Sequence, residues 1–334
     1  GAITAALFLN RFITATQCWA HFDIPAWIDR PKPGRRKGAE ANAIRALNKG
    51  AAMGGFAHDT GEGGFSRYHK EFGGDIVWEI GSGYFGCRNA DGSFCAEKFA
   101  DEAANPQIKM IEIKLSQGAK PGHGGVLPGA KVTEEIAAAR GVAVGVDCVS
   151  PASHSAFSTP VEMMHFIARL RDLSGGKPVG FKLCVGHGWE FLAICKAMLE
   201  TGIYPDFIVV DGTEGGTGAA PLEFLDHLGK PMREGLTFVH NALIGIGARD
   251  KVRIAASGKI ASAFDIARAM ALGADFVLAG KAFLWGLGAM GDDGPSHTLD
   301  LFMDEMRATL GQIGAHNFAE ARKVAIRHPG RFEI

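Results

Sequence analysis

The sequence predicts an α/β protein folded as a (βα)8 TIM barrel, on three observations. Short apolar runs alternate with amphipathic stretches of helical length from residue 108 onward. The runs are nearly continuously apolar, which is typical of parallel strands buried on both faces. Eight such runs can be counted, and no linker-like segment interrupts them. A chain of 334 residues is therefore expected to form one barrel rather than two domains.

Each element follows from its local pattern. Strands are expected at 55–59, 75–81, 108–115, 142–149, 178–185, 207–211, 252–257 and 276–280. Helices are expected at 42–53, 131–140, 160–173, 189–200, 232–246, 261–272, 297–313 and 317–327. The helix at 160–173 has a defined start, because Thr159 and Glu162 form a capping-box pattern with Pro160 at the first helical position. Residues 1–41 follow no such pattern, so we assign an N-terminal extension to 1–41 and the barrel with its C-terminal helices to 42–334.

Composition excludes several classes of protein. With 35 Lys and Arg against 36 Asp and Glu, the net charge of -1 offers no field for binding nucleic acid. The six cysteines contain no CxxC pair, and no histidine spacing is typical of a metal site, so we predict neither a metal nor a disulfide framework. Asn10 and Arg11 interrupt the apolar N-terminal stretch before it could span a bilayer. We expect a cytoplasmic protein without a membrane partner, and the sequence leaves its oligomeric state open.

Glycine is unusually abundant and gathers in the turns that follow the strands. The chain has 46 glycines, about twice the usual share of ~7%. Glycine-rich backbone can form concave nests whose N–H groups bind phosphate, and barrel enzymes place phosphate in the loops after their seventh and eighth strands. The turns at 212–218, 257–259 and 280–281, with the hydroxyls of Thr217 and Ser257, therefore favour a phosphorylated ligand.

Two lysines lie in runs that are otherwise built for burial. Lys114 ends its predicted strand and Lys182 lies inside another, where an unpaired ammonium group is costly. Each is expected to pair with a ligand or a carboxylate. For Lys182, an internal ion pair with Glu112 or Asp211 remains the alternative to a ligand contact. The histidines beside the loops, among them His154, are expected to be hydrogen-bonded structural residues.

Seven segments resemble the FMN-binding barrel domain of the glutamate synthase large subunit and its stand-alone relatives. They are GGFAHDTGEGG (54–64), GSGYFGCR (81–88), EIKLSQGAKPGHGGVLPGAKV (112–132), SP (150–151), FKLCVG (181–186), VVDGTEGGTGAAPLEFLDHLG (209–229) and RIAASGKI (253–260). They occur in order across about residues 42–282, and the combination of QGAKPG with GGTGAAP is specific.

This resemblance implies FMN as the cofactor and assigns roles to individual residues. The residues that would contact FMN are Thr60, Gln117, Lys182, Asp211, Gly215, Gly216, Thr217, Ser257, Gly258, Gly280 and Lys281. Within this set, Lys182 would lie near the pyrimidine edge of the flavin. Residues that match substrate-binding positions around a 2-oxo dicarboxylate are Lys114, Gln117, Lys120 and Arg140. Glu62 matches a carboxylate at the mouth of the site, and the catalytic set is Lys114, Gln117, Lys120 and Glu62.

The resemblance also implies a reaction, with two alternatives. We expect hydride transfer between flavin N5 and a small amino or oxo acid, with an electron-donor protein or subunit as a partner. The chain is too short to hold a glutaminase domain as well, and the segment after Gly280 lacks the cysteines of the family's iron–sulfur centre. The tail at 301–314 resembles FMN-dependent 2-hydroxy-acid oxidases, although Thr213 and Glu214 begin the segment that replaces their His-Gly-Gly-Arg motif. Such an oxidase is one alternative, and a non-catalytic barrel subunit that binds FMN or phosphate is the other.

Overall fold

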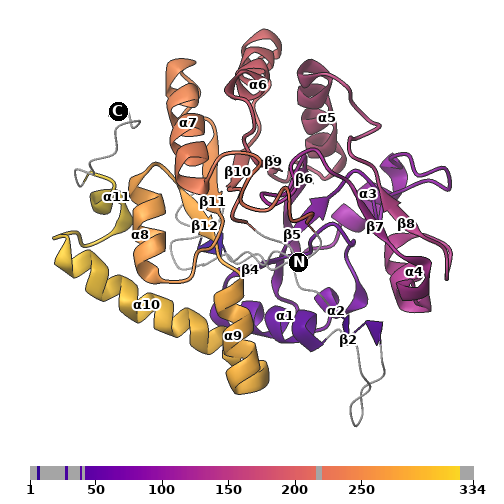
Figure 1. The fold of residues 1–334 in the computed structure, drawn as a ribbon, viewed down its shortest axis with the longest axis horizontal. Coiled ribbons are helices and arrows are strands. Elements are labelled where there is room, and N and C mark those ends of the chain that lie inside the picture. Colours follow the sequence, from indigo (N-terminus) through magenta and orange to yellow (C-terminus); the bar gives the residue numbers. More distant parts are fainter. Residues whose placement is uncertain (1–5, 8–26, 29–37, 40–41, 216–219, 324–334) are drawn as a thin grey trace.

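A curled parallel sheet with helices packed outside it forms the body of the protein (Figure 1). The computed structural model describes residues 6–7, 27–28, 38–39, 42–215 and 220–323. The parallel strands are β4 (Ala57–Asp59), β5 (Asp75–Ile80), β6 (Ile108–Lys114), β9 (Val179–Leu183), β10 (Phe207–Asp211), β11 (Arg253–Ser257) and β12 (Phe276–Leu278). The short β1 (Ala6–Leu7) pairs antiparallel with β12, so the order along the sheet is β1-β12-β11-β10-β9-β6-β5-β4. The predicted α/β class and barrel type of sheet are confirmed.

The strand predicted at 142–149 is wrong. In its place β8 (Cys148–Ser150) pairs antiparallel with β7 (Gly125–Leu127) in a separate two-stranded sheet, and β6 pairs directly with β9. Gly145 has a φ of +75°, which breaks the extended conformation, and Val144 and Val146 are more than half exposed. The described sheet therefore contains seven parallel strands rather than eight. The apolar residues of this segment are not covered as those of a central strand would be.

The helices largely lie where periodicity places them. They are α1 (Asn42–Gly54), α2 (Arg67–Lys70), α3 (Ala96–Ala103), α4 (Glu134–Arg140), α5 (Pro160–Leu173), α6 (Gly188–Thr201), α7 (Met232–Gly245), α8 (Ala263–Ala271), α9 (Lys281–Met290), α10 (Gly294–Gln312) and α11 (Phe318–Ala321). Two 3₁₀ turns, η1 (Gly129–Lys131) and η2 (Gly291–Asp293), and the pair β2 (Trp27–Ile28) and β3 (Gly38–Ala39) complete the described elements. The sequence did not predict α2, α3 or α9. None of the described helices has the length and apolar character needed to cross a bilayer.

The predicted capping box at the start of α5 is present. The Thr159 hydroxyl accepts a hydrogen bond from the Glu162 N–H at 3.2 Å, and the Glu162 carboxylate accepts one from the Thr159 N–H at 3.1 Å. We expect Thr159→Ala to lower the free energy of unfolding by about 1 kcal/mol, because it leaves a helix N–H without its partner. Urea denaturation measures the change, and a Thr159→Ser variant should retain most of the stability. Equal loss in both variants would contradict this explanation.

Two layers of side chains fill the inner face of the curled sheet. The layer nearer the amino ends of the strands is an apolar cluster of Ala57, Val77, Met110, Phe207, Val209, Ala255, Phe276 and Leu278. Side chains alternate between faces along a strand, so the inward residues of the next layer come two positions later. That layer is polar and comprises Asp59, Glu79, Glu112, Lys182, Asp211 and Ser257, all of them buried. The outward residues pack against the helices in the main core. The charges therefore lie at the carboxyl ends of the strands.

The helix α10 runs across the outside of the sheet near its two ends (Figure 1). It packs against α1, which precedes β4, and against α8 and α9, which flank β12. Phe302 of α10 packs edge-on against Phe283 of α9, with ring centroids 5.6 Å apart. Through these contacts α10 joins the first and last described βα units.

Candidate active site

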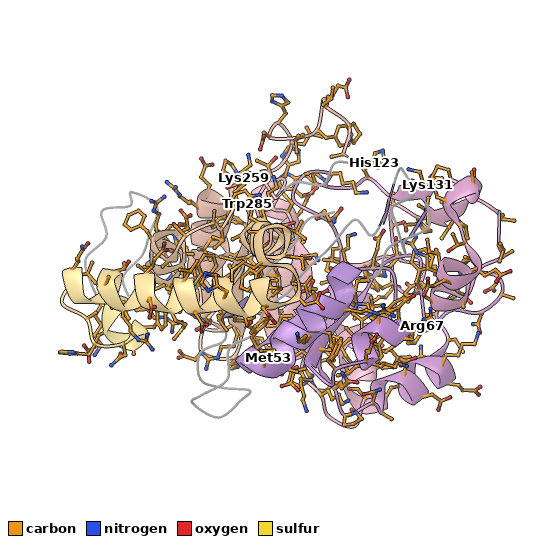
Figure 2. All side chains as sticks on the ribbon, turned by 90° about the horizontal axis from the view of Figure 1, so that it is seen from below. Met53, Arg67, His123, Lys131, Lys259 and Trp285 are labelled. Carbon is orange, nitrogen blue, oxygen red and sulfur yellow. The ribbon has the colours of Figure 1, made fainter. Side chains whose placement is uncertain are left out.

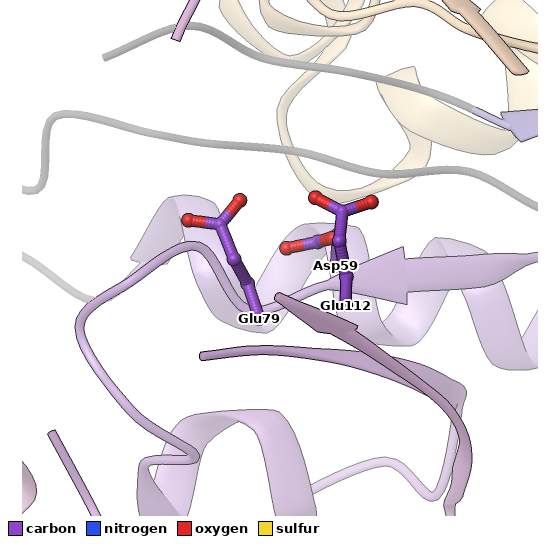
Figure 3. Close-up of side chains that lie close together, drawn as sticks. All are labelled: Asp59, Glu79 and Glu112. Carbon is purple, nitrogen blue, oxygen red and sulfur yellow. The ribbon is translucent and has the colours of Figure 1, made fainter. Parts of the chain in front are cut away.

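A buried group of three carboxylates and one ammonium lies on the inner face of the sheet. Asp59, Glu79 and Glu112 come from the neighbouring strands β4, β5 and β6, and Figure 3 shows their side chains converging. Glu79 and Glu112 are opposite each other in the strand register. Lys182 of β9 forms ion pairs with Glu79 and with Glu112, the second at 3.0 Å. The internal pair between Lys182 and Glu112, the alternative weighed from the sequence, is therefore present.

Burial and crowding shift the pKa values in this group. Burial, opposed by Lys182 and reinforced by Glu79, raises the pKa of Glu112 to about 7. Burial, with the charges of Glu112 and Glu79, also raises the pKa of Asp59 well above its usual range. Burial disfavours the ammonium of Lys182, but the three carboxylates outweigh it and raise the pKa of Lys182. The lysine therefore stays charged, and the carboxylates compete for protons.

A second charged group lies next to the first, toward the mouth of the barrel. Lys114, the last residue of β6, places its Nζ 2.7 Å from Oε2 of Glu62 and 4.0 Å from Oε1 of Glu79. Burial alone would raise the pKa of Glu62, but Lys114, Lys120 and Arg140 together lower it to about 2. The structure thus brings together all three predicted substrate-binding cations around the predicted carboxylate. Glu62 remains ionised at any physiological pH.

Local structure holds these cations in place. Gln117 and Lys120 form a short bridge within the turn after β6, and both side chains are buried. Arg140 ends α4, where its guanidinium lies 4.8 Å above the ring of Phe85. Thr133 caps the other end of the same helix. A cation–π contact and a capped helix therefore orient Arg140 toward Glu62.

Asp211, at the end of β10, fastens three of the loops to one another. Its Oδ2 accepts a hydrogen bond from the Gly118 N–H and its Oδ1 accepts one from the Ser257 hydroxyl, both at 2.7 Å. The Ala119 N–H donates to the Gly215 carbonyl at 3.1 Å. A Cβ on Gly118 would overlap the carbonyl oxygen of Gly212, so the backbones approach too closely for any side chain there. Asp211 and Ser257, at the ends of their strands, thus connect the turns that follow β6, β10 and β11.

The predicted phosphate-binding turns lie at the ends of β11 and β12. Gly258 has a φ of +132°, a conformation available to glycine. Gly280 precedes α9, whose first turn has no side-chain cap and no acidic residue, and Lys281 opens the helix with an exposed side chain. In Figure 2, Lys259 and His123, from loops after β11 and β6, lie on the same side of the molecule. The predicted contacts Gly216 and Thr217 lie outside the described residues.

Thr60 has a structural use in addition to its predicted role. Its hydroxyl donates to the carbonyl of Gly61 at 2.9 Å and accepts a hydrogen bond from the Glu79 N–H at 3.0 Å. The threonine thereby connects the turn after β4 to β5, next to the buried carboxylates.

Sequence reasoning missed three contributors to the site. Asp59 and Glu79 were not singled out, although each is a charged residue two positions after a buried inward residue of its strand. Tyr84 was also missed. His154 lies with Nε2 2.9 Å from the Lys114 carbonyl oxygen and Nδ1 3.2 Å from the Tyr84 hydroxyl, and burial lowers its pKa to about 4. The expectation of a structural, hydrogen-bonded histidine is confirmed for His154.

Residues 38–291 match the family model described as a conserved region in glutamate synthase. The chain therefore belongs to the glutamate synthase family. The chain is 45% identical over 249 residues to the glutamate synthase large subunit-like protein YerD of Bacillus subtilis, covering 74% of this chain and 47% of that protein. It is 37% identical over 248 residues to an archaeal-type glutamate synthase [NADPH] of Thermotoga neapolitana, covering 74% and 46%. The chain thus spans less than half the length of these relatives.

Solved structures share the fold at low sequence identity. A mandelate oxidase with (S)-4-hydroxymandelic acid superposes with a TM-score of 0.59 at 17% identity, over 97% of this chain and 84% of the oxidase. A flavocytochrome b2 with sulfite bound gives a TM-score of 0.58 at 12% identity, over 96% and 71%. At such identities the likeness shows the fold alone.

Proposed function

We propose that this chain is an FMN-dependent oxidoreductase of the glutamate synthase-like type, which exchanges a hydride between flavin N5 and a small amino or oxo acid. The observation that carries the proposal is the convergence of Lys114, Lys120 and Arg140 around Glu62 at the carboxyl ends of the strands. Membership in the glutamate synthase family supports it, because these four residues lie within the segment that matches the family model. An electron-donating protein or subunit is part of the same proposal.

The residues present fit an FMN phosphate. The uncapped N-terminus of α9 offers backbone N–H groups, and the helix dipole there favours an anion. Lys281 adds a positive charge. Gly258, which has a positive φ, carries no side chain that would fill the space beside the neighbouring turn. The sequence resemblance also assigns Gly216 and Thr217, which lie outside the described residues, to the phosphate. Bound FMN would supply the two-electron redox chemistry, which no side chain of this group can provide.

The cation cluster fits a small acid with one or two carboxylates. Lys114, Lys120 and Arg140 can form charge-assisted hydrogen bonds with carboxylate oxygens, and Gln117 adds an amide. Glu62 balances these charges when no acid is bound, and its low pKa keeps it available to an amine. We propose that Glu62 orients the amino or imino nitrogen while the cations hold the carboxylates.

Titration of the purified chain with FMN tests the cofactor. We expect the flavin absorption bands to shift on binding, because the isoalloxazine leaves water for a protein site. Lys281→Glu should weaken binding by roughly tenfold or more, since it reverses a charge at the phosphate site. Lys251→Glu makes the same charge change beside the amino end of β11 and should bind FMN as the unmodified chain does. A spectrum of FMN that does not change with added protein would refute the proposal.

A further inference from the structure

Two cysteines face each other across a short hairpin between β5 and α3, which we call the 87–95 hairpin. Cys87 lies on one arm and Cys95 on the other, and the Cys95 N–H donates a hydrogen bond to the Cys87 carbonyl at 2.9 Å. One step nearer the tip, Arg88 and Phe94 form an antiparallel bridge. Residues that are directly opposite in such a ladder carry their side chains on the same face. The two thiols therefore share one face of the hairpin.

The turn at the tip fixes this pairing. The Gly92 N–H donates to the Asn89 carbonyl at 3.0 Å, and the Asn89 N–H donates to the Ser93 carbonyl at 2.8 Å. Gly92 has a φ of +87°, which is typical of the last residue in a three-residue hairpin loop. The Asp91 carboxylate accepts a further hydrogen bond from the Ser93 N–H at 2.9 Å. A shift of one residue would break these bonds, so the turn holds the two cysteines opposite each other.

The spacing of the two cysteines suits a disulfide bond. Opposed residues that share a backbone hydrogen bond in an antiparallel pair have Cα atoms about 5.5 Å apart. Disulfides join residues whose Cα atoms are roughly 4.4–6.8 Å apart, so the arms of the hairpin already have a suitable separation. Both thiols are free in the structure. The pair is thus a dithiol with the backbone geometry that a disulfide requires.

The two thiols lie in different environments. Cys87 is fully buried in the main core, and burial, reinforced by the neighbouring Cys95, raises the pKa of the Cys87 thiol. Cys95 is only partly buried and is the N-cap residue of α3. An oxidant in the solvent reaches an accessible thiol before a buried one. Cys95 is therefore placed to react first, and Cys87 to react second.

We propose that Cys87 and Cys95 form a modification site at which hydrogen peroxide produces a reversible disulfide. The Cys95 thiolate attacks the peroxide, so that an S–O bond forms, the O–O bond breaks, and the released hydroxide takes up a proton to give water. The Cys87 sulfur then attacks the sulfenic acid, which forms the S–S bond, breaks the S–O bond and releases the Cys87 proton with the hydroxyl group as a second water. Two thiols are oxidised and one peroxide is reduced. This site is independent of the proposed function.

The cross-link restrains a loop beside the candidate active site. The ring of Phe85, on the same loop, lies 4.8 Å from the Arg140 guanidinium and 5.6 Å from that of Arg88. Lys98 of α3 donates to the Arg88 carbonyl at 2.7 Å, so the hairpin already contacts the helix that follows it. A disulfide at the base of the hairpin would fasten the loop that orients Arg140 to the start of α3.

Peptide mapping after treatment with hydrogen peroxide tests the pairing. Trypsin cleaves after Arg88 and therefore places Cys87 and Cys95 on separate peptides, 71–88 and 89–98, each with one cysteine. Free thiols are blocked by alkylation before digestion. We expect the two peptides to be joined by a bond that dithiothreitol breaks. Recovery of both peptides separately, with each cysteine alkylated, would overturn the proposal.

Single replacements test the order of the two steps. Cys87→Ala removes the second thiol, so dimedone should trap a sulfenic acid on Cys95 that the unmodified chain does not accumulate. Cys95→Ser keeps a favourable N-cap residue and should leave Cys87 reduced after the same treatment. Cys195→Ala, which removes a buried thiol on α6, should still give the cross-link. Oxidation of Cys87 in the Cys95→Ser variant, or loss of the cross-link in Cys195→Ala, would overturn the assigned pair.

Thermal unfolding tests the restraint. We expect peroxide to raise the Tm of the unmodified chain by about 2 °C or more, because a closed loop limits the conformations of the unfolded chain. The Tm of Cys95→Ser should be the same with and without peroxide. An unmodified chain that forms the cross-link without any rise in Tm would show that the disulfide does not hold the loop.

Discussion

Replacing Lys182 with methionine is expected to lower the free energy of unfolding by about 3–5 kcal/mol at pH 8. Among the described residues, Lys182 is the ammonium that pairs with both Glu79 and Glu112, and the change removes its positive charge from between these buried carboxylates. Urea denaturation with an unchanged m value would measure the loss. The loss should shrink at pH 5, because Asp59 and Glu112 have raised pKa values and the folded protein can then take up further protons.

Two further variants separate this effect from lost packing. Combining Lys182→Met with Glu79→Gln and Glu112→Gln should restore much of the stability, since the neutral amides remove the repulsion that the single change exposes. Lys109→Met, which removes a half-exposed lysine paired with Asp75 on the neighbouring strand, should change stability by no more than about 1 kcal/mol. If Lys182→Met were as stable as the unmodified protein at pH 8, the charge-balance explanation would be wrong.

Gly118→Ala is expected to destabilise the protein by about 3 kcal/mol and to disrupt the loops that form the candidate site. The added methyl group would overlap the Gly212 carbonyl, and neither backbone can move without breaking the hydrogen bond from Gly118 to Asp211. FMN binding should weaken in parallel, because the turns after β6, β10 and β11 share Asp211 as their anchor. Thermal unfolding and FMN titration measure the two effects.

The matched control is Gly311→Ala in α10. A Cβ at this position meets no atom within 4 Å, so the change should be neutral or stabilise the protein by up to about 1 kcal/mol through helix propensity. A Gly118→Ala variant within experimental error of the unmodified protein would show that the two loops are not packed together as described.

Much of the fold could be predicted from local sequence patterns, and each prediction that failed did so for a physical reason. The start of α5 was predictable because the capping residues lie within four positions of one another. The segment at 142–149 was not, because apolar content reports neither a pairing partner nor the positive φ of Gly145. The helix α9 was missed since its sequence, KAFLWGLGAM, is apolar on nearly every side and shows no helical periodicity.

The site was predictable in its residue types but not in its connections. Lys114 and Lys182 attracted attention as charges in buried runs, and Glu112 was considered as a partner of Lys182. Glu79, which contacts both lysines, was missed because its role depends on the register between β5 and β6. Register is a long-range property that a single sequence does not display.

The helix α10 lies outside the segment that matches the family model, yet it packs against helices inside that segment. The conserved family region ends at residue 291, before this helix begins at Gly294. A fragment that ended at that boundary would lack α10 and would expose the surfaces of α1, α8 and α9 that α10 covers. It would also lose the contacts through which α10 connects α1 with α8 and α9. The segment that matches the family model therefore contains the candidate site, whereas a helix outside that segment packs the first and last described βα units together.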